Sequence, residues 1–301
     1  MSLPQFVYKG HGTGNDFVIY IDLEGKLEPT ADEVRHICDR HFGIGADGLI
    51  RLTKPEYVSD LSAVAAEQCR EGGADWFMDY RNADGTLAEM CGNGTRVTTL
   101  LAQRAGIADV PGGAPFKLGT RAGAKTLRSL GALEPYGDDV FQVSLGAGKI
   151  GELDTYKVTI PGTDGEAAGT FVDMGNPHVV SILEDGKAAL PAVEDLNLIV
   201  KPVVSPMIET DQNAEFVRID ACDKAADTGR ATMRVNERGC GETLSCGTGL
   251  GATAVTLRAK TGVSHWDISI RGGLVHVDVS DEDVLLTGAA VIVAKIELLE
   301  K

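Results

Sequence analysis

A short motif that begins with cysteine occurs twice in the chain, and its two cysteines could transfer protons. Cys91 begins Cys91-Gly92-Asn93-Gly94, and Cys246 begins Cys246-Gly247-Thr248-Gly249. A helix is expected after each, so the N–H groups and dipole at its N-terminus would favour a thiolate and could bind a carboxylate. Two acid/base groups flanking one carbon can remove a proton from one face and return it to the other, which is racemisation or epimerisation. The alternative is that both are buried structural cysteines, the commoner fate of a single cysteine.

The two cysteine sequences belong to an internal repeat. Residues 78–94 align with residues 233–249, at an offset of 155 residues, about half of the 301-residue chain. Each copy consists of an expected strand, a polar turn and Cys-Gly-x-Gly, followed by an expected helix over 95–105 or 250–260. A glycine follows each of these helices, where a helix typically ends. We interpret the repeat as a duplication that faces both helix starts onto one cavity, with one sulfur on each side.

Elsewhere, short strands outnumber helices and follow one another without a helix between each pair. One helix is expected to begin at Thr30, which forms a capping box with Glu33. An extra surface helix is expected over 57–71 from the helical spacing of Leu61, Val64, Ala65 and Gln68. This order favours a mixed or antiparallel α+β fold over a doubly wound sheet. The expected strands cover residues 6–9, 17–20, 49–52, 76–81, 141–145, 157–160, 171–174, 179–182, 216–219, 268–270 and 275–279.

The overall composition is that of an acidic globular chain. It holds 28 Lys+Arg against 44 Asp+Glu, a formal net charge of −16, and 43% hydrophobic residues, enough for a packed core. Nucleic acids and anionic membranes bind basic patches, so we expect neither as a partner. The first residues lack the features of a signal peptide and no apolar run reaches about 20 residues, so we expect a soluble, cytoplasmic protein with reduced thiols. The remaining cysteines are expected to be structural: Cys38 in the core, and Cys69, Cys222 and Cys240.

Sequence patterns for cofactors and metals are weak. Gly43-Ile44-Gly45-Ala46-Asp47-Gly48 matches Gly-x-Gly-x-x-Gly, but it follows an expected helix and opens an expected strand, the reverse of a dinucleotide-binding context. The six histidines and six cysteines show no metal-ligand spacing. We therefore expect neither a cofactor nor a metal.

Seven blocks of sequence, spread in order over nearly the whole chain, carry a resemblance to one family. They are residues 9–17, 81–85, 90–96, 174–178, 213–217, 236–243 and 245–249. On these blocks the chain closely resembles the diaminopimelate epimerases, which are cofactor-independent enzymes of bacterial lysine and cell-wall precursor synthesis.

The resemblance implies two pseudo-symmetric α+β domains, each a small barrel of strands around a central helix, with the active site in the cleft between them. The N-terminal domain would cover residues 1–145 with a C-terminal strand at 291–301, and the C-terminal domain would cover residues 146–290. The implied reaction is the epimerisation of LL-2,6-diaminopimelate to meso-diaminopimelate without pyridoxal phosphate or another cofactor. Cys91 and Cys246 would be the two proton-transfer groups, one a thiolate and the other a thiol.

The resemblance also implies roles for residues around the cysteines. Arg238 would hold a substrate carboxylate, for which a guanidinium is apt. Glu237 would hold the ammonium at the reacting centre, and His178 and Glu237 would tune the acidity of the thiols. Backbone N–H groups would bind the α-carboxylate and stabilise the charge that builds on it. These N–H groups belong to Gly92, Asn93, Gly247 and Thr248, and the side chains expected to bind the polar ends of the substrate are Asn15, Asn82, Asn176 and Asn213.

Simpler interpretations stay open from the sequence alone. Asparagines beside glycines can be turn formers, and His178, which follows a proline, can be a surface-loop histidine. Arg238 can pair with Glu237 or Glu242. The chain as a whole can also be a racemase or epimerase of another amino acid on the same fold, or a non-catalytic thiol redox sensor.

The chain departs from the family pattern at three places. Some members have Gln in the substrate-binding set where Gly48 stands here. The helical insert between Thr53 and Gly73 is longer than in many relatives. Residues 290–294 lack an aromatic that supports dimer packing in some members, so the sequence leaves a homodimer open.

Overall fold

The computed structural model describes residues 3–108, 114–183 and 189–299, so residues 300–301 of the expected C-terminal strand lie outside the described part. The chain forms two compact units. Unit 1 consists of residues 1–143 and 288–301, and unit 2 consists of residues 144–287.

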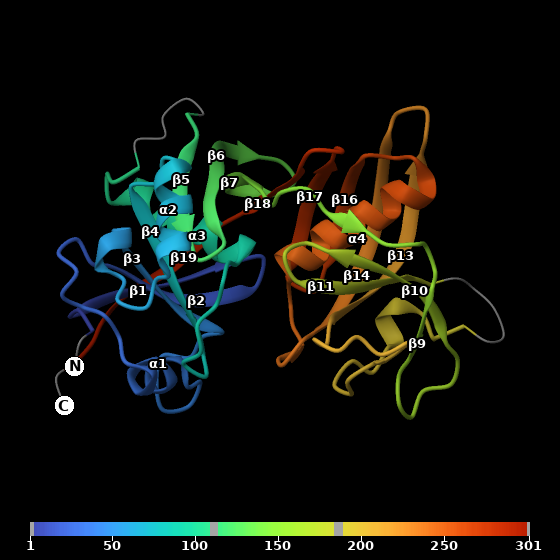
Figure 1. Ribbon diagram of the computed structural model, residues 1–301, viewed down its shortest axis with the longest axis horizontal. Helices are drawn as coiled ribbons and strands as arrows, with labels where there is room; N and C mark the ends of the chain where they lie inside the picture. Colours follow the sequence, from blue (N-terminus) through green and yellow to red (C-terminus); the bar gives the residue numbers. More distant parts are fainter. Residues whose placement is uncertain (1–2, 109–113, 184–188, 300–301) are drawn as a thin grey trace. The chain divides into compact units, whose positions relative to one another are not determined.

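Unit 1 surrounds one helix, α3 (Gly92–Arg104), with strands, as Figure 1 shows. The strands pair in the order β19-β1-β2-β3-β4-β5-β6-β7, and all pairs are antiparallel except β2–β3 and β4–β5. The other helices are α1 (Ala31–Cys38), α2 (Ala63–Glu71) and the short 3-10 helix η1 (Pro55–Tyr57). The strands are β1 (Phe6–Gly12), β2 (Asn15–Ile21), β3 (Gly48–Thr53), β4 (Trp76–Asn82), β5 (Phe116–Thr120), β6 (Gly123–Leu133), β7 (Gly137–Ser144) and β19 (Val291–Glu297).

Unit 2 surrounds the helix α4 (Gly247–Thr261) in the same way. Its main strands pair in the order β8-β10-β11-β13-β14-β16-β17-β18, and the parallel pairs are β11–β13 and β14–β16. Three short elements add to this set: β12 (Val203–Ser205), β15 (Gly241–Glu242) and the 3-10 helix η3 (Val193–Asp195). The other strands are β8 (Lys149–Ile150), β9 (Tyr156–Thr159), β10 (Ala167–Asp173), β11 (Pro177–Ile182), β13 (Asn213–Asp223), β14 (Thr228–Glu237), β16 (His265–Ile270), β17 (Gly273–Val279) and β18 (Val284–Ala289).

The two units therefore repeat one topology. In each, the third to sixth strands of the order above form a parallel, then an antiparallel, then a parallel pair. The helix α3 connects the parallel pair β4–β5, and α4 connects the parallel pair β14–β16. A parallel pair needs a crossover connection, and in both units the crossover is the helix that begins at the cysteine. The α+β fold class with two like domains is confirmed.

Both cysteine helices are buried on nearly all sides, which is unusual for helices rich in threonine. Every residue of α3 from Gly92 to Ala102 is buried. The threonine hydroxyls donate hydrogen bonds to backbone carbonyls of their own helix. Thr98 donates to the carbonyl of Gly94 at 2.7 Å, and Thr256 of α4 donates to the carbonyl of Ala252 at 2.9 Å. This local bond lets a small polar side chain enter the core without an unsatisfied donor.

Most expected elements are present. All the expected strands overlap strands of the structure, and the capping box of Thr30 and Glu33 is formed at the start of α1. Gly262 ends α4 in the left-handed conformation, at φ 82°. The glycine-rich segment 43–48 does follow a helix and open β3, as expected.

Two details of the expectation are wrong. The helix α2 begins at Ala63 and not near Tyr57, and Val64, expected on its apolar face, is 68% exposed. Its inner side carries Cys69, which is fully buried. Of the cysteines expected to be structural, Cys222 and Cys240 are exposed.

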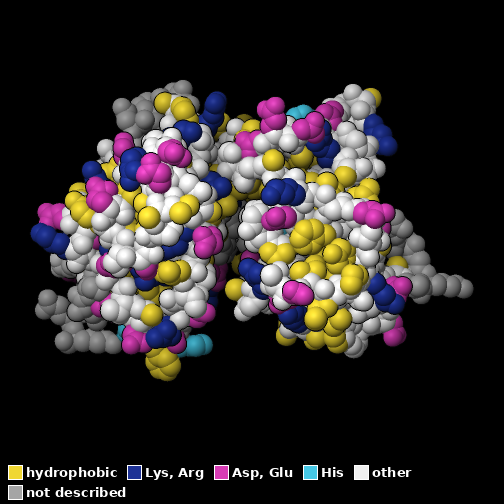
Figure 2. All heavy atoms as spheres, in the orientation of Figure 1, with side chains coloured by type: hydrophobic (Ala, Val, Ile, Leu, Met, Phe, Trp, Pro, Cys, Tyr) yellow, Lys and Arg dark blue, Asp and Glu magenta, His cyan; other side chains and the backbone are white. Residues whose placement is uncertain are grey.

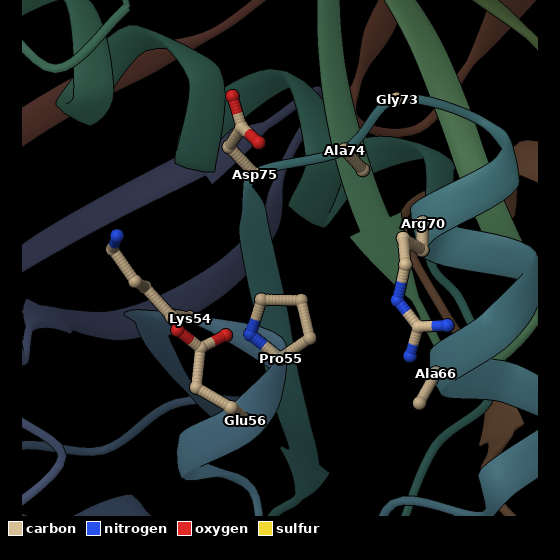
Figure 3. Close-up of a pocket in the computed structure, with 8 residues that line it drawn as sticks. All are labelled: Lys54, Pro55, Glu56, Ala66, Arg70, Gly73, Ala74 and Asp75. Carbon is tan, nitrogen blue, oxygen red and sulfur yellow. The ribbon is translucent and has the colours of Figure 1, made fainter.

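The insert after β3 forms a small core of its own. Val58, Cys69, Ala74 and Phe77 pack together there, and the Cys69 thiol donates to the carbonyl of Thr120 at 3.4 Å. A surface hollow of about 330 Å³ lies between η1 and α2. In Figure 3, Lys54 and Glu56 lie across this hollow from Arg70. None of the residues expected in the active site lines it.

The surface mixes both signs of charge. On the face that Figure 2 shows, acidic side chains are interspersed with Lys and Arg on both units. In the described part of the chain, no helix combines the length and the apolar character needed to cross a membrane.

Candidate functional site

Cys91 caps the N-terminus of α3 in an extended backbone conformation, with φ −141° and ψ 117°. Its Sγ accepts a hydrogen bond from the Gly94 N–H at 3.4 Å, a position usually taken by a side-chain oxygen. The N–H groups of the first turn have no acceptor within the helix and carry the positive end of its dipole. The half-buried thiol therefore lies where a thiolate is favoured and where an anion can bind.

A series of side chains connects Cys91 to the start of β3. The Cys91 thiol donates to Asn15 Oδ1 at 3.3 Å, and Asn15 Nδ2 donates to Asp47 Oδ2 at 2.7 Å. Arg40 holds the other oxygen of Asp47 at 2.8 Å. Asn93, in the first turn of α3, also donates to Asn15 Oδ1, at 3.3 Å. The amide of Asn15 is thus oriented from both sides, with its oxygen toward the sulfur.

Arg96 supports the Cys91 loop from inside and was not singled out from the sequence. It is fully buried, and its guanidinium donates to the carbonyl of Ala289 at 3.0 Å and to the Thr13 hydroxyl at 3.1 Å. It also donates to the side chain of Asn93. Burial lowers the pKa of Arg96 to about 10, and the charge of Cys91 opposes this effect. A positive charge near Cys91 favours the thiolate, which makes Arg96 part of the site.

Asn82 and Gly48 lie on paired positions of β4 and β3. Asn82 Nδ2 donates to the Thr86 hydroxyl at 3.1 Å, within the turn that follows β4. At Gly48, an added Cβ would lie 2.5 Å from the ring of Tyr80 and 2.6 Å from the carbonyl oxygen of Arg81. A real Cβ does not approach so closely, so the aromatic ring of Tyr80 occupies the space that a Gln side chain would need here.

Cys246 caps α4 in the same extended conformation, with φ −122° and ψ 113°, but it is buried. Its Sγ lies 3.6 Å from the Thr248 hydroxyl. Burial, together with the nearby carboxylates of Glu237 and Glu215, raises the pKa of the Cys246 thiol well above its usual value. The hydrogen bonds from Thr248 and from the Gly249 N–H oppose this rise only in part. Unit 2 therefore favours a neutral thiol, which is a proton donor.

Glu237 ends β14 beside this thiol. The Thr243 hydroxyl donates to Glu237 Oε1 at 2.5 Å. Burial raises the pKa of Glu237, while hydrogen bonds from Thr243 and Cys246 act in the opposite direction. The carboxylate and the Cys246 thiol thus share a hydrogen bond in a place with little water.

His178 lies within the core of unit 2 and not in a surface loop. It is 0% exposed, and its Nδ1 lies 2.7 Å from Glu215 Oε1 while its Nε2 lies 3.0 Å from Asn176 Oδ1. Asn176 Nδ2 in turn donates to the Thr248 hydroxyl at 3.3 Å. The buried pair of His178 and Glu215 is thereby connected to the first turn of α4.

Glu215 is a second residue that the sequence argument passed over. It is fully buried on β13, two positions after Asn213, so the two side chains share one face of the strand. An added Cβ on Gly249 would lie 2.7 Å from Glu215 Oε1 and 3.3 Å from Cys246 Sγ. The alternation of the polar residues Asn213 and Glu215 along this strand is the sequence feature from which Glu215 could have been predicted.

Arg238 and Asn213 position one another. The Arg238 N–H donates to Asn213 Oδ1 at 2.9 Å, and the exposed guanidinium donates to the carbonyl of Thr210 at 3.0 Å. The alternative pairing with Glu242 is not made, since Glu242 pairs with Arg234 at 2.7 Å. No carboxylate forms an ion pair with Arg238 in the described ranges of the chain. Its remaining donors can therefore receive a ligand.

Each unit thus holds a half-site with a sulfur, helix N–H groups and oriented amides. In unit 1, the structure joins Cys91, Asn15 and Asn93. In unit 2, it joins Cys246 to Glu237 and Thr248, and through Thr248 to Asn176 and His178, while Asn213 and Arg238 contact one another. These groups suit proton transfer at a carbon next to a carboxylate. Among the described residues, one set of three side chains that could hold a metal ion is found, on β16 and β17, and it includes no residue of either half-site.

Comparison with known proteins matches this sequence to one family. A family model described as "Diaminopimelate epimerase" matches residues 7–129 and 170–293. The diaminopimelate epimerase of Thermobifida fusca is 36% identical over 291 residues, 95% of each chain. That of Mycolicibacterium gilvum is 38% identical over 298 residues, 97% of this chain and 96% of its own.

Solved structures share the fold at low identity. A phenazine biosynthesis protein of the PhzF family from Bacillus anthracis has a TM-score of 0.65 at 16% identity, covering 98% of this chain and 99% of its own. A hydroxyproline epimerase from Agrobacterium vitis has a TM-score of 0.61 at 13% identity, covering 97% and 92%.

Proposed function

The chain belongs to the diaminopimelate epimerase family of isomerases, and on this premise we propose that it converts LL-2,6-diaminopimelate to meso-diaminopimelate by proton transfer between two cysteines and the α-carbon. The observation that carries the proposal is the duplicated half-site, in which a cysteine caps a buried helix at the equivalent place in both units. The two units would be the two functional domains. The reaction supplies lysine and cell-wall precursors, as the resemblance implies.

The proton balance of the reaction needs one thiolate and one thiol. The thiolate removes the α-proton, and the electron pair of the broken C–H bond moves onto the α-carbon and its carboxylate. The thiol of the other cysteine then gives its proton to the opposite face. The configuration inverts, and the two cysteines exchange protonation states, so no redox partner is consumed. The N–H groups of Gly92, Asn93, Gly247 and Thr248 would stabilise the charge that builds on the carboxylate.

We assign the more acidic thiol to Cys91. It receives the Gly94 N–H and lies near the buried Arg96 guanidinium, both of which stabilise a negative sulfur. Cys246 receives the equivalent Gly249 N–H, but it is more deeply buried and lies near two carboxylates, which destabilise a negative sulfur. In the free enzyme, Cys91 would therefore act as the base and Cys246 as the acid.

The polar residues suit a long substrate with a carboxylate and an ammonium at each end. Arg238 would bind the distal carboxylate through its unpaired donors, and Asn213 would hold Arg238 in place. Glu237 would bind the ammonium at the reacting carbon. Asn15 would contact the substrate beside Cys91, while Asn82 and Asn176 would complete the set from the two units.

Incubation with LL-diaminopimelate in deuterated water tests the reaction. Proton NMR and mass spectrometry should show deuterium at the inverted α-carbon as meso-diaminopimelate forms. Cys91→Ala and Cys246→Ala should each lower kcat by roughly 10²- to 10⁴-fold, the usual contribution of one general acid or base.

Cys222→Ala is the matched control, because Cys222 is exposed and lies outside both half-sites. This variant should keep full activity. Absence of exchange by the unaltered protein, or full turnover by both active-site variants, would contradict the proposal.

A further inference from the structure

Two histidines and two aspartates gather on one face of unit 2, on strands that the proposed reaction does not use. His265 and Asp267 alternate along β16, and His276 and Asp278 alternate along β17. The antiparallel register pairs His265 with Asp278 and Asp267 with His276. Alternate residues of paired strands share one face, so the four side chains form a rectangle of two imidazoles and two carboxylates.

Three of these side chains converge on one point. Asp278 Oδ1 lies 2.6 Å from His265 Nδ1 and 2.9 Å from His276 Nε2. One ligand atom from each of the three residues lies within 4.8 Å of the other two. The imidazole rings are stacked nearly in parallel, with an interplanar angle of 11° and centroids 6.4 Å apart.

The outward nitrogens of both imidazoles also face carboxylates. His276 Nδ1 lies 2.7 Å from Asp267 Oδ1, and His265 Nε2 lies 3.7 Å from Asp227 Oδ2. A carboxylate on the far nitrogen is the usual support of a metal-bound histidine, since it fixes the ring orientation and makes the ligating nitrogen more basic.

We propose that His265 Nδ1, His276 Nε2 and the Asp278 carboxylate bind a divalent transition-metal ion of the zinc class, with Asp267 and Asp227 orienting the two imidazoles. Imidazole with one carboxylate suits Zn²⁺, Ni²⁺ or Cu²⁺, whereas Mg²⁺ and Ca²⁺ prefer oxygen ligands alone. The fourth position would hold water, because the site is open to solvent: the His265 side chain is 47% exposed.

The geometry needs only a small adjustment. Tetrahedral coordination with bonds of about 2.1 Å places ligand atoms about 3.4 Å apart. The ligand atoms now joined by hydrogen bonds of 2.6 and 2.9 Å would separate by about 0.8 and 0.5 Å. The ion would replace the two protons in these hydrogen bonds, and both protons would be released to solvent. It would join β16 to β17 and, through Asp227, to the turn before β14.

Calorimetric titration of the full chain with Zn²⁺ tests the site. We expect one saturable equivalent, and a thermal unfolding temperature that rises with Zn²⁺ because the ion binds only the folded chain. His265→Gln and His276→Gln should lose both effects. Asp267→Asn should weaken binding by roughly 10- to 100-fold while keeping one equivalent.

His41→Gln is the matched control, since it removes an exposed histidine from unit 1 and should bind as the unaltered chain does. Co²⁺ is the second probe: visible bands without thiolate charge transfer support the site even if a histidine variant fails to fold. Absence of saturable binding by the unaltered chain, equal binding by both histidine variants, or thiolate charge transfer would each overturn the proposal. Because epimerase activity is not the readout, failure here is distinct from failure of the proposed function.

Discussion

Replacement of Gly249 by alanine should destabilise unit 2, because the new methyl group meets a buried carboxylate. The added Cβ would lie 2.7 Å from Glu215 Oε1, closer than real Cβ contacts. Glu215 is fully buried and holds His178 at 2.7 Å, so its side chain has no easy way to move aside. The backbone itself is no obstacle, since Gly249 does not have a positive φ.

The size of the effect follows from two opposing contributions. Alanine in place of glycine within a helix stabilises by about 1 kcal/mol. Separating a buried charge from its partner destabilises by about 3–5 kcal/mol. We therefore expect Gly249→Ala to lower the free energy of unfolding by about 2–4 kcal/mol, measured by urea denaturation followed by circular dichroism.

The equivalent glycine of unit 1 provides the matched control. An added Cβ on Gly94 would lie 3.1 Å from Ile50 Cδ1 and 3.6 Å from Met78 Sδ, the ends of flexible side chains. Gly94→Ala should therefore stay within about 1 kcal/mol of the unaltered chain. The same substitution at the same place in the repeat should thus have different consequences in the two units.

A double-mutant cycle identifies the cause. In a Glu215→Ala background the carboxylate is gone, so Gly249→Ala should cost little, with a coupling energy of about 2 kcal/mol or more. An equal cost in both backgrounds, or a Gly249→Ala variant as stable as Gly94→Ala, would refute the reasoning.

Three further predictions concern the residues around the cysteines. The rate of alkylation by iodoacetamide, followed by peptide mass spectrometry, should rise at lower pH for Cys91 than for Cys246, whose pKa is raised by burial and two carboxylates; the reverse order would contradict the assignment of the base. Arg96→Met should lower the free energy of unfolding by about 3 kcal/mol, because buried acceptors lose a charged donor. It should also move the alkylation of Cys91 to higher pH. An unchanged alkylation profile would mean that Arg96 has only a structural role. Gly48→Gln should destabilise by about 1–3 kcal/mol through overpacking against Tyr80, measured by thermal unfolding, and Tyr80→Ala should relieve part of this cost; a neutral Gly48→Gln variant would show that the ring moves freely.

The main elements of the fold followed from local signals. The capping box at Thr30 and Glu33 starts α1 as expected, because both partners lie within one turn of the chain. The alternating strands and the glycine after α4 are local in the same sense. The helix α2 was expected too early, and of its expected apolar face Ala65 is buried but Val64 is exposed. Its sequence is nearly as apolar at Val64 as at Cys69, and only packing against the sheet distinguishes the two.

The candidate site divides in the same way. The repeat of Cys-Gly-x-Gly identified Cys91 and Cys246, because the signals that start a helix lie in consecutive residues. Arg96 and Glu215 were passed over because charged residues in a helix and a strand are usually exposed. Their burial depends on contacts with distant segments, such as the bond from Arg96 to Ala289.

The sequence by itself determined the duplicated topology and the two cysteines that begin buried helices, because periodicity, caps and repeats need only neighbouring residues. Tertiary structure alone decided the environment of each thiol and which side chains contact each histidine. His265 and His276 have no metal-ligand spacing in the chain, yet the register of two antiparallel strands brings both to Asp278. The reason is physical: the pKa of a thiol and the geometry of a ligand set depend on distances across the fold, which pairing and packing set.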